Sequence, residues 1–126
     1  MASKRRVMIV EDDQALREMY KDAFKHSGFD VVEAGDGQSA IDIALSEEPS
    51  VMLLDIMMPK QGGLGTLRIM RTMPELKNIP VLMLTALDNK DYRDIAKNMA
   101  QGYVLKTETS IGDLIKRVEL IIKETS

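Results

Sequence analysis

Polar side chains of the kinds that bind metal ions and phosphates stand at the ends of several short apolar runs in this sequence. They are Glu11, Asp12 and Asp13 after RVMIV (6–10), Asp55 at the end of VMLLD (51–55), Thr85 at the end of VLMLT (81–85) and Lys106 at the end of YVLK (103–106). If these runs are neighbouring parallel strands, their carboxyl ends open at one edge of a sheet. The polar groups would then share one site.

The charges of such a site determine its chemistry. Carboxylates about 4 Å apart repel each other by roughly 4 kcal/mol at an effective dielectric constant of about 20, so the cluster requires a bound cation or a raised pKa. Oxygen ligands favour Mg²⁺, with Mn²⁺ or Ca²⁺ as alternatives. Because Mg²⁺ usually completes its shell with water and phosphate oxygens, we expect phosphoryl chemistry. Asp55 is the candidate nucleophile, while Lys106 would neutralise phosphoryl oxygens and Thr85 would donate a hydrogen bond to one.

Five apolar runs that alternate with five helical patterns must position these groups. The run not yet mentioned is DVVEA (30–34), the second along the chain. The runs 6–10, 51–55 and 81–85 are apolar almost throughout, as expected when helices cover both faces of a parallel sheet. Apolar residues recur at helical spacing in 14–28, 38–48, about 65–73, about 89–99 and about 111–124. Asp13, Asp88 and Ser110 are the predicted N-caps of the first, fourth and fifth helices.

Alternating strands and helices with right-handed crossovers predict a doubly wound parallel sheet inside a three-layer α/β sandwich. The run 30–34 is the best candidate for an edge strand because Asp30 and Glu33 lie within it. Its end, Ala34 and Gly35, offers no functional group to the site.

Composition limits the classes of function. The chain has 126 residues, 44% of them hydrophobic, so we expect residues 1–126 to form a single domain. A net charge of −3 disfavours direct binding to nucleic acid or to a membrane surface. The absence of cysteine excludes disulfides and a cysteine-based zinc site. No stretch is apolar enough for a signal peptide or a membrane span, which predicts a cytoplasmic protein.

The segments VMIVEDD, VMLLDIMMPKQGG, VLMLTA and GYVLK together resemble the receiver domain of two-component response regulators. The resemblance covers essentially the whole chain, and the chemotaxis response regulator is the single-domain example of this family. It implies a flavodoxin-like fold with strand order 2-1-3-4-5 and five helices. It also implies a phosphorylation-dependent signalling switch of a phosphorelay, which catalyses only its own phosphorylation and dephosphorylation. The phosphoryl donor would be a histidine kinase or a histidine phosphotransfer protein, and the chain would be a monomer or a phosphorylation-linked dimer.

The resemblance also assigns the metal and phosphate sites. Asp55 corresponds to the phospho-accepting aspartate, and Glu11 with Asp12 corresponds to the acidic pair that holds Mg²⁺. In the family the second acid binds the metal directly and the first mostly through water, so these parts fall to Asp12 and Glu11. Asp55 and the backbone carbonyl of Met57 would be the remaining protein ligands.

Three further positions correspond to the parts of the family that bind and report phosphate. Lys106 matches the phosphate-binding lysine, Thr85 the switch hydroxyl and Tyr103 the aromatic switch. Family behaviour implies that phosphorylation draws Thr85 toward the phosphoryl group and lets Tyr103 turn inward. The face made by the fourth helix, the fifth strand and the fifth helix would then change for a partner protein, whose identity the sequence leaves open.

The chain departs from the family pattern at four places. Lys106-Thr107 replaces a common Lys-Pro with a cis bond; a cis non-proline bond costs about 2.5–4 kcal/mol, so the isomer is left open. Gln61 and Gly62 predict a more flexible loop after the third strand. NMAQGY lacks the usual Gly-Ala, so the fourth helix is expected to end differently. Met57 and Leu87, two residues beyond Asp55 and Thr85, cannot hydrogen-bond an attacking water, which predicts slow self-dephosphorylation.

Three other functions compete with this interpretation. A haloacid-dehalogenase-like phosphatase needs a second Asp where Met57 stands. A flavodoxin-like FMN protein needs a phosphate loop where EDDQA would repel phosphate. A pseudo-receiver blind to phosphate would usually have lost Asp55 or Lys106, and both are present.

Overall fold

Five parallel strands form one sheet in a computed structural model that describes residues 5–125. The spatial order is β2-β1-β3-β4-β5, which confirms the predicted topology and places β2 at an edge. The strands are β1 (Arg6–Val10), β2 (Asp30–Ala34), β3 (Val51–Leu54), β4 (Val81–Thr85) and β5 (Gly102–Leu105). Residues 1–4 and 126 of the predicted single domain lie outside the described residues.

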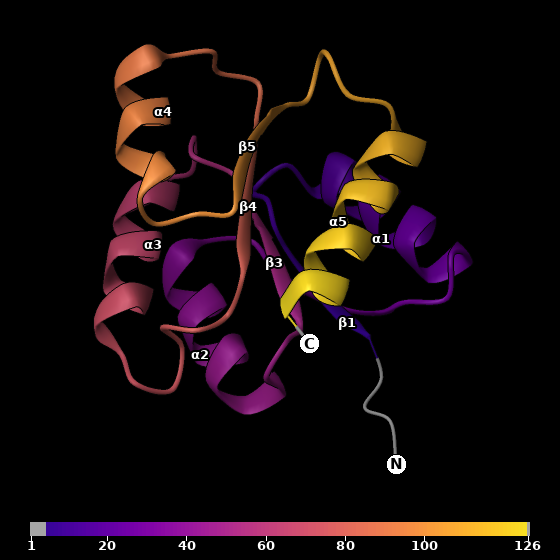
Figure 1. The fold of residues 1–126 in the computed structure, drawn as a ribbon, viewed down its shortest axis with the longest axis horizontal. Coiled ribbons are helices and arrows are strands. Elements are labelled where there is room, and N and C mark those ends of the chain that lie inside the picture. Colours follow the sequence, from indigo (N-terminus) through magenta and orange to yellow (C-terminus); the bar gives the residue numbers. More distant parts are fainter. Residues whose placement is uncertain (1–4, 126) are drawn as a thin grey trace.

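Five helices cover the two faces of this sheet and complete the predicted three-layer sandwich. They are α1 (Gln14–His26), α2 (Gly37–Glu47), α3 (Gly62–Thr72), α4 (Lys90–Lys97) and α5 (Ile111–Thr125). Figure 1 shows the sheet nearly edge-on, with α1 and α5 on one side and α2, α3 and α4 on the other. Helix α3 begins three residues earlier than expected, at Gly62, and α4 is shorter than predicted at both ends.

Alternate side chains of each central strand enter different cores because successive residues of a strand point to opposite faces. In β1, Met8 and Val10 pack toward α2 and α3, whereas Val7 and Ile9 join the core that contains Tyr20 and Phe24 of α1. Both sides of β1 and β3 are therefore buried, which explains their apolar runs. Polar residues can appear only where these strands end.

Short polar side chains cap the N-termini of α1, α2, α4 and α5, and one prediction about these caps is wrong. Asp13 accepts a hydrogen bond from the amide of Leu16 at 3.0 Å, and Ser110 accepts one from the amide of Asp113 at 3.1 Å, as predicted. Helix α4, however, is capped by Asn89 and not by Asp88. Asp88 instead pairs with Arg93 at 2.6 Å, because the helix starts one residue later than the sequence pattern suggested.

The structure shows the outcome of two departures from the family pattern, the Lys106-Thr107 bond and the end of α4. Within the described residues there is no cis peptide bond, so the bond between Lys106 and Thr107 is trans. Helix α4 ends at Lys97, and the chain that follows is held by side chains from elsewhere. Arg71 of α3 donates to the carbonyl of Met99 at 2.7 Å, and the Gln101 side chain accepts from the amide of Val81 at 2.7 Å. None of the described helices has the length and apolarity needed to cross a membrane.

Candidate functional site

Three acidic residues follow β1, and the fold separates their tasks. Glu11 is 4% exposed, whereas Asp12 lies exposed beside it. Asp13 turns away to cap α1, which agrees with its prediction as an N-cap and not as a third ligand. The Glu11 amide donates to the carbonyl of Ala34 at 3.1 Å, so the end of β2 contributes backbone to the site although it offers no functional side chain.

Asp55 is the first residue after β3 and is only 5% exposed. Its amide donates to the carbonyl of Val10 at 3.1 Å, which brings it level with the end of β1. Its Oδ1 accepts a hydrogen bond from the amide of Met57 at 3.2 Å. Gly63 of α3 fits closely behind, because a Cβ atom there would lie 1.9 Å from the Asp55 carbonyl oxygen. The backbone of Asp55 is thus fixed on both sides.

Lys106 reaches the same place from the end of β5. Its ammonium donates to Oδ2 of Asp55 at 3.1 Å and also forms an ion pair with Glu11. Burial would lower the pKa of Lys106, but its hydrogen bonds to Glu11 and Asp55 outweigh burial and raise the pKa. Burial raises the pKa of the Glu11 carboxyl, against the opposing effect of Lys106. The ammonium therefore stays charged between two carboxylates that are 95 and 51 residues away in the chain.

The carboxylates have the chemistry and spacing of a divalent-metal site. One oxygen from each of Glu11, Asp12 and Asp55 lies within 4.8 Å of the others. Oxygen donors at this spacing suit a hard cation such as Mg²⁺, and the exposed Asp12 leaves a side from which water or phosphate can approach. The structure thus brings together the three predicted carboxylate ligands; the Met57 carbonyl remains a prediction.

Thr85 and Tyr103 both form hydrogen bonds with Leu87, in the loop between β4 and α4. The buried Thr85 hydroxyl accepts a hydrogen bond from the amide of Leu87 at 3.2 Å. The hydroxyl of the half-buried Tyr103 donates to the Leu87 carbonyl at 2.6 Å. Burial raises the pKa of Tyr103, so the phenol is protonated at neutral pH and able to donate. Both predicted switch residues therefore hold the same peptide segment.

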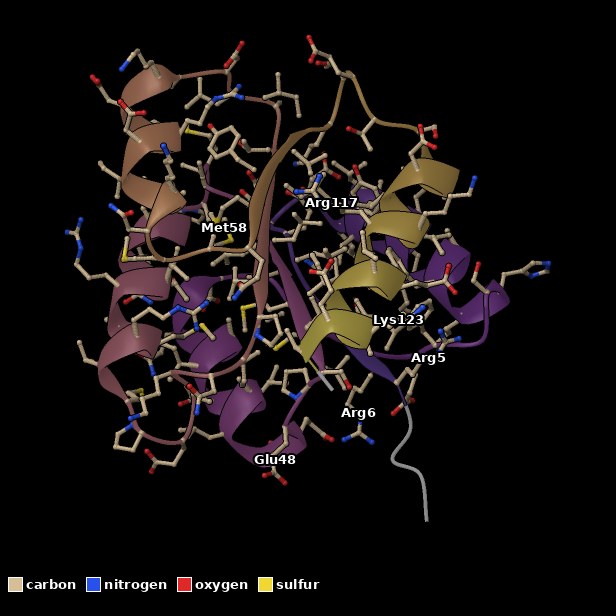
Figure 2. All side chains as sticks on the ribbon, viewed as in Figure 1. Arg5, Arg6, Glu48, Met58, Arg117 and Lys123 are labelled. Carbon is tan, nitrogen blue, oxygen red and sulfur yellow. The ribbon has the colours of Figure 1, made fainter. Side chains whose placement is uncertain are left out.

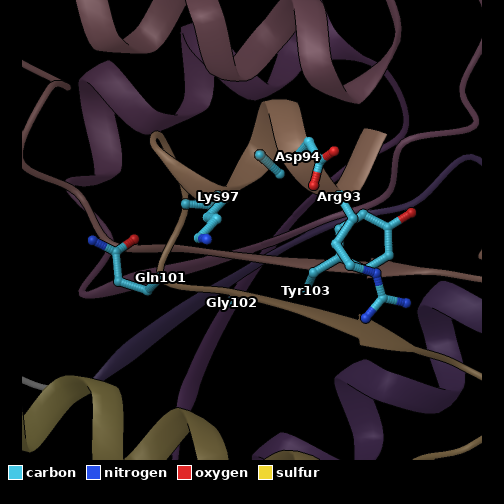
Figure 3. A pocket seen from close by; sticks show the side chains of 8 residues that line it. Arg93, Asp94, Lys97, Gln101, Gly102 and Tyr103 are labelled. Carbon is cyan, nitrogen blue, oxygen red and sulfur yellow. The ribbon is translucent and has the colours of Figure 1, made fainter. Parts of the chain in front are cut away.

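Tyr103 also borders a groove of about 390 Å³ between α4 and β5 (Figure 3). The guanidinium of Arg93 lies over the Tyr103 ring, 4.9 Å from its centre, while it pairs with Asp88. Lys97 and Gln101 line the other end of the groove. The two predicted rate-tuning residues differ in exposure: Met57 is 57% exposed, whereas Leu87 is half-buried.

Sequence reasoning missed Arg17, which donates from α1 to the carbonyl of Glu11 at 2.6 Å. Arg17 lies within the predicted helix 14–28, and nothing local in the sequence indicated that its side chain reaches the end of β1. The missed cap Asn89 and the contacts of Arg71 have the same origin, since they depend on how helices pack on the sheet.

The fold places this chain among the flavodoxin-like doubly wound α/β proteins, here with buried carboxylates and a lysine at the ends of β1, β3 and β5. Comparison with known proteins gives the family. Residues 7–119 match the response regulator receiver domain. The chain belongs to this family, whose general function is that of a phosphorylation-controlled switch in two-component systems paired with histidine kinases.

Relatives of known sequence are response regulators. The chain is 38% identical over 121 residues to the probable transcriptional regulatory protein TcrX of Mycobacterium tuberculosis, covering 94% of this chain and 50% of TcrX. It is 30% identical over 121 residues to the response regulator MprA of Mycolicibacterium vanbaalenii, covering 96% of this chain and 52% of MprA. The chain therefore spans about half the length of these curated relatives.

Solved structures show the same fold. The receiver domain of the Francisella response regulator 1452 superposes with a TM-score of 0.87 at 31% identity, covering 97% of this chain and 99% of that one. The chemotaxis protein CheY4 of Vibrio cholerae gives a TM-score of 0.87 at 25% identity, covering 94% and 99%.

Proposed function

We propose that this chain accepts a phosphoryl group on Asp55 from a histidine kinase or a histidine phosphotransfer protein. The observation that carries the proposal is the position of Asp55: a nearly buried carboxylate at a rigid strand end, beside Lys106 and two further acids. A carboxylate oxygen of Asp55 forms the new bond to phosphorus, and the bond from phosphorus to the leaving atom of the donor breaks. Residues 1–126 act as one receiver domain in this proposal.

The residues around Asp55 orient it and bind the incoming charge. The Met57 amide and Lys106 each donate a hydrogen bond to one carboxylate oxygen of Asp55, and these two bonds fix the orientation of the carboxylate. Lys106 is already charged and can follow from Asp55 to the phosphoryl oxygens. Glu11, Asp12, Asp55 and the Met57 carbonyl would hold Mg²⁺. The metal supplies positive charge that neutralises the transferring phosphoryl group.

The shared hold on Leu87 supplies a route from the site to the surface. If the Thr85 hydroxyl turns to donate to a phosphoryl oxygen, it no longer accepts from the Leu87 amide. The Leu87 carbonyl then shifts with its peptide segment, and the hydrogen bond that holds Tyr103 in place is weakened. We propose that Tyr103 turns inward and that the surface of α4, β5 and α5 changes for a protein partner.

The output of the described residues runs through protein contacts in this proposal. These residues bind no nucleic acid directly, and the chain is a monomer or forms a dimer that depends on phosphorylation. The net charge of −3 and the mixed charges around the α4–β5 groove support contact with protein surfaces over contact with phosphodiester backbones.

Intact-mass spectrometry after incubation with acetyl phosphate and Mg²⁺ tests the proposal. We expect one phosphoryl adduct that is absent in Asp55→Asn and retained in Asp42→Asn, a matched change of an exposed aspartate on α2. Beryllofluoride with Mg²⁺ should shift the amide resonances of Leu87 and Tyr103 in the wild-type chain and in Asp42→Asn, but not in Asp55→Asn. A wild-type chain that forms no adduct and shows no metal-dependent response would identify a pseudo-receiver.

A further inference from the structure

Arg17 links α1 to the strand end that carries the acidic pair. Its side chain is 18% exposed. Nη1 donates to the backbone carbonyl of Glu11 at 2.6 Å, while Nε donates to Oε1 of Glu33 in β2 at 3.0 Å. A planar guanidinium can satisfy both acceptors at once because its donors point in fixed, diverging directions. One side chain thus ties the end of β1 to the edge strand.

Two neighbours make room for Arg17 and balance its charge. Gly35 has no side chain, and a Cβ atom there would lie 3.2 Å from Nη1 of Arg17. Glu33 pairs with Arg17 and also with Lys21 at 3.1 Å. Burial opposes ionisation of Glu33, but these two cations prevail and lower its pKa. An ionised Glu33 offsets the guanidinium, so Arg17 can hold the turn without imposing an uncompensated positive charge beside Glu11 and Asp12.

We propose that Arg17 is a positioning residue for the metal-binding acids, which holds the turn from Glu11 to Asp13 in the conformation that presents their carboxylates. The inference rests on the proposed Mg²⁺ site. The backbone of Glu11 is held on both sides of its Cα, since its amide donates to Ala34 and its carbonyl accepts from Arg17. Mg²⁺ demands near-ideal octahedral geometry, so a loosened turn lowers affinity even though every ligand is still present. Partners that orient metal ligands typically change affinity by roughly 10- to 100-fold.

Arg6 provides a matched control at the other end of the same strand. Its Nε donates to Asp30 of β2 at 2.7 Å and its Nη1 donates to the carbonyl of Glu47 at 2.6 Å. Figure 2 shows Arg6 at the amino end of β1, away from the loops that follow the strands. Arg6 therefore binds one carboxylate in β2 and one carbonyl, as Arg17 does, and also pairs with the Glu47 carboxylate at 3.2 Å, but these partners lie away from the turn from Glu11 to Asp13.

The first test needs no metal. Amide hydrogen exchange followed by ¹⁵N NMR reports on the amides of Glu11 and Asp13, which donate to Ala34 and to the Glu11 carboxylate. We expect Arg17→Met to speed exchange at these two amides about tenfold, which corresponds to the loss of one charge-assisted hydrogen bond. Arg6→Met should leave both amides unchanged. Equal effects of the two substitutions, or none from Arg17→Met, would overturn the proposal.

The second test titrates the same samples with Mg²⁺. Arg17→Met should weaken binding roughly 10- to 100-fold, whereas Arg6→Met should bind like the wild type. Arg17→Lys keeps the charge but reaches only one of the two acceptors, so we expect it to weaken Mg²⁺ binding as well. This variant replaces Arg17→Met in both tests if Arg17→Met does not fold. A wild-type chain that binds no Mg²⁺ would reject the proposed function, while the exchange data would still decide whether Arg17 holds the turn. Wild-type affinity in both Arg17 variants would reject the inference alone.

Discussion

The acidic pocket and the segment around Leu87 are held in different ways. In the pocket, Glu11, Asp55 and Lys106 follow the ends of three strands and are largely buried, and Lys106 donates one charged hydrogen bond to each carboxylate. The Leu87 segment is held by one hydrogen bond from Tyr103 and one to Thr85, and Ala96 is the one fully buried residue among the eight of α4. Elements with few buried contacts open at low free energy cost. The proposed chemistry therefore lies on the more tightly held part of the domain, and the proposed response lies on the part that opens more easily.

The largest effect should come from Lys106→Met. Removal of the ammonium leaves Glu11 and Asp55 facing each other, and breaking a buried ion pair typically costs about 3–5 kcal/mol. Because the pocket opens to solvent beside Asp12, we expect a loss near the lower end, about 3 kcal/mol in urea unfolding without metal. Added Mg²⁺ should restore part of this loss.

Lys90→Met is the control for this comparison. Lys90 pairs with Asp94 on α4, but both side chains are exposed and screened by water, so its removal should leave the free energy of unfolding nearly unchanged. If the two lysine substitutions cost the same, the pocket is not the more tightly held region and the comparison fails.

We also propose that Met57 and Leu87 shield the phosphoryl group from water and slow its loss, because neither side chain can hydrogen-bond an attacking water. Met57→Asn or Leu87→Glu introduces a group that can orient an attacking water, and we expect the phosphorylated chain to decay about tenfold faster, which is about 1.4 kcal/mol in the barrier. Loss of the phosphoryl adduct with time in Mg²⁺ measures the rate. Met19→Asn changes an exposed methionine that lies on α1, away from the site, and should leave the rate unchanged. Unaltered decay in both site variants would remove the shielding argument.

Tyr103→Phe should have the smallest effect and should be confined to the mobile region. Loss of one hydrogen bond to the Leu87 carbonyl costs about 1 kcal/mol. Amide exchange should rise in the loop and in α4, with Glu11 and Asp55 unaffected. Tyr92→Phe, on α4 itself, retains the hydroxyl of Tyr103 and should not reproduce this pattern. Faster amide exchange in the turn from Glu11 to Asp13 would show that the acidic pocket and the Leu87 segment open together, which would contradict the comparison.

Much of the fold was predictable because both faces of the central strands are buried. Continuous apolar runs could form only covered parallel strands, and polar residues such as Asp55 and Thr85 therefore marked their ends. Helix boundaries were less certain: Asp88 and Asn89 are both good caps, and sequence pattern alone chose the wrong one. The cap depends on where the loop from β4 lets the helix begin.

By itself, the sequence determined the alternation of strands and helices, the edge position of β2 and the identities of the carboxylates, the hydroxyl and the lysine at the strand ends. These features follow from local periodicity and from the common direction of parallel strands. Only the tertiary structure decided that Lys106 pairs with Glu11 and Asp55, that Thr85 and Tyr103 meet at Leu87, and that Arg17 donates to the Glu11 carbonyl. The contacts of Lys106 join residues 95 and 51 positions apart in the chain. The others link a strand, or the residue that follows it, to a loop or a helix, so their existence depends on how these segments pack against the sheet.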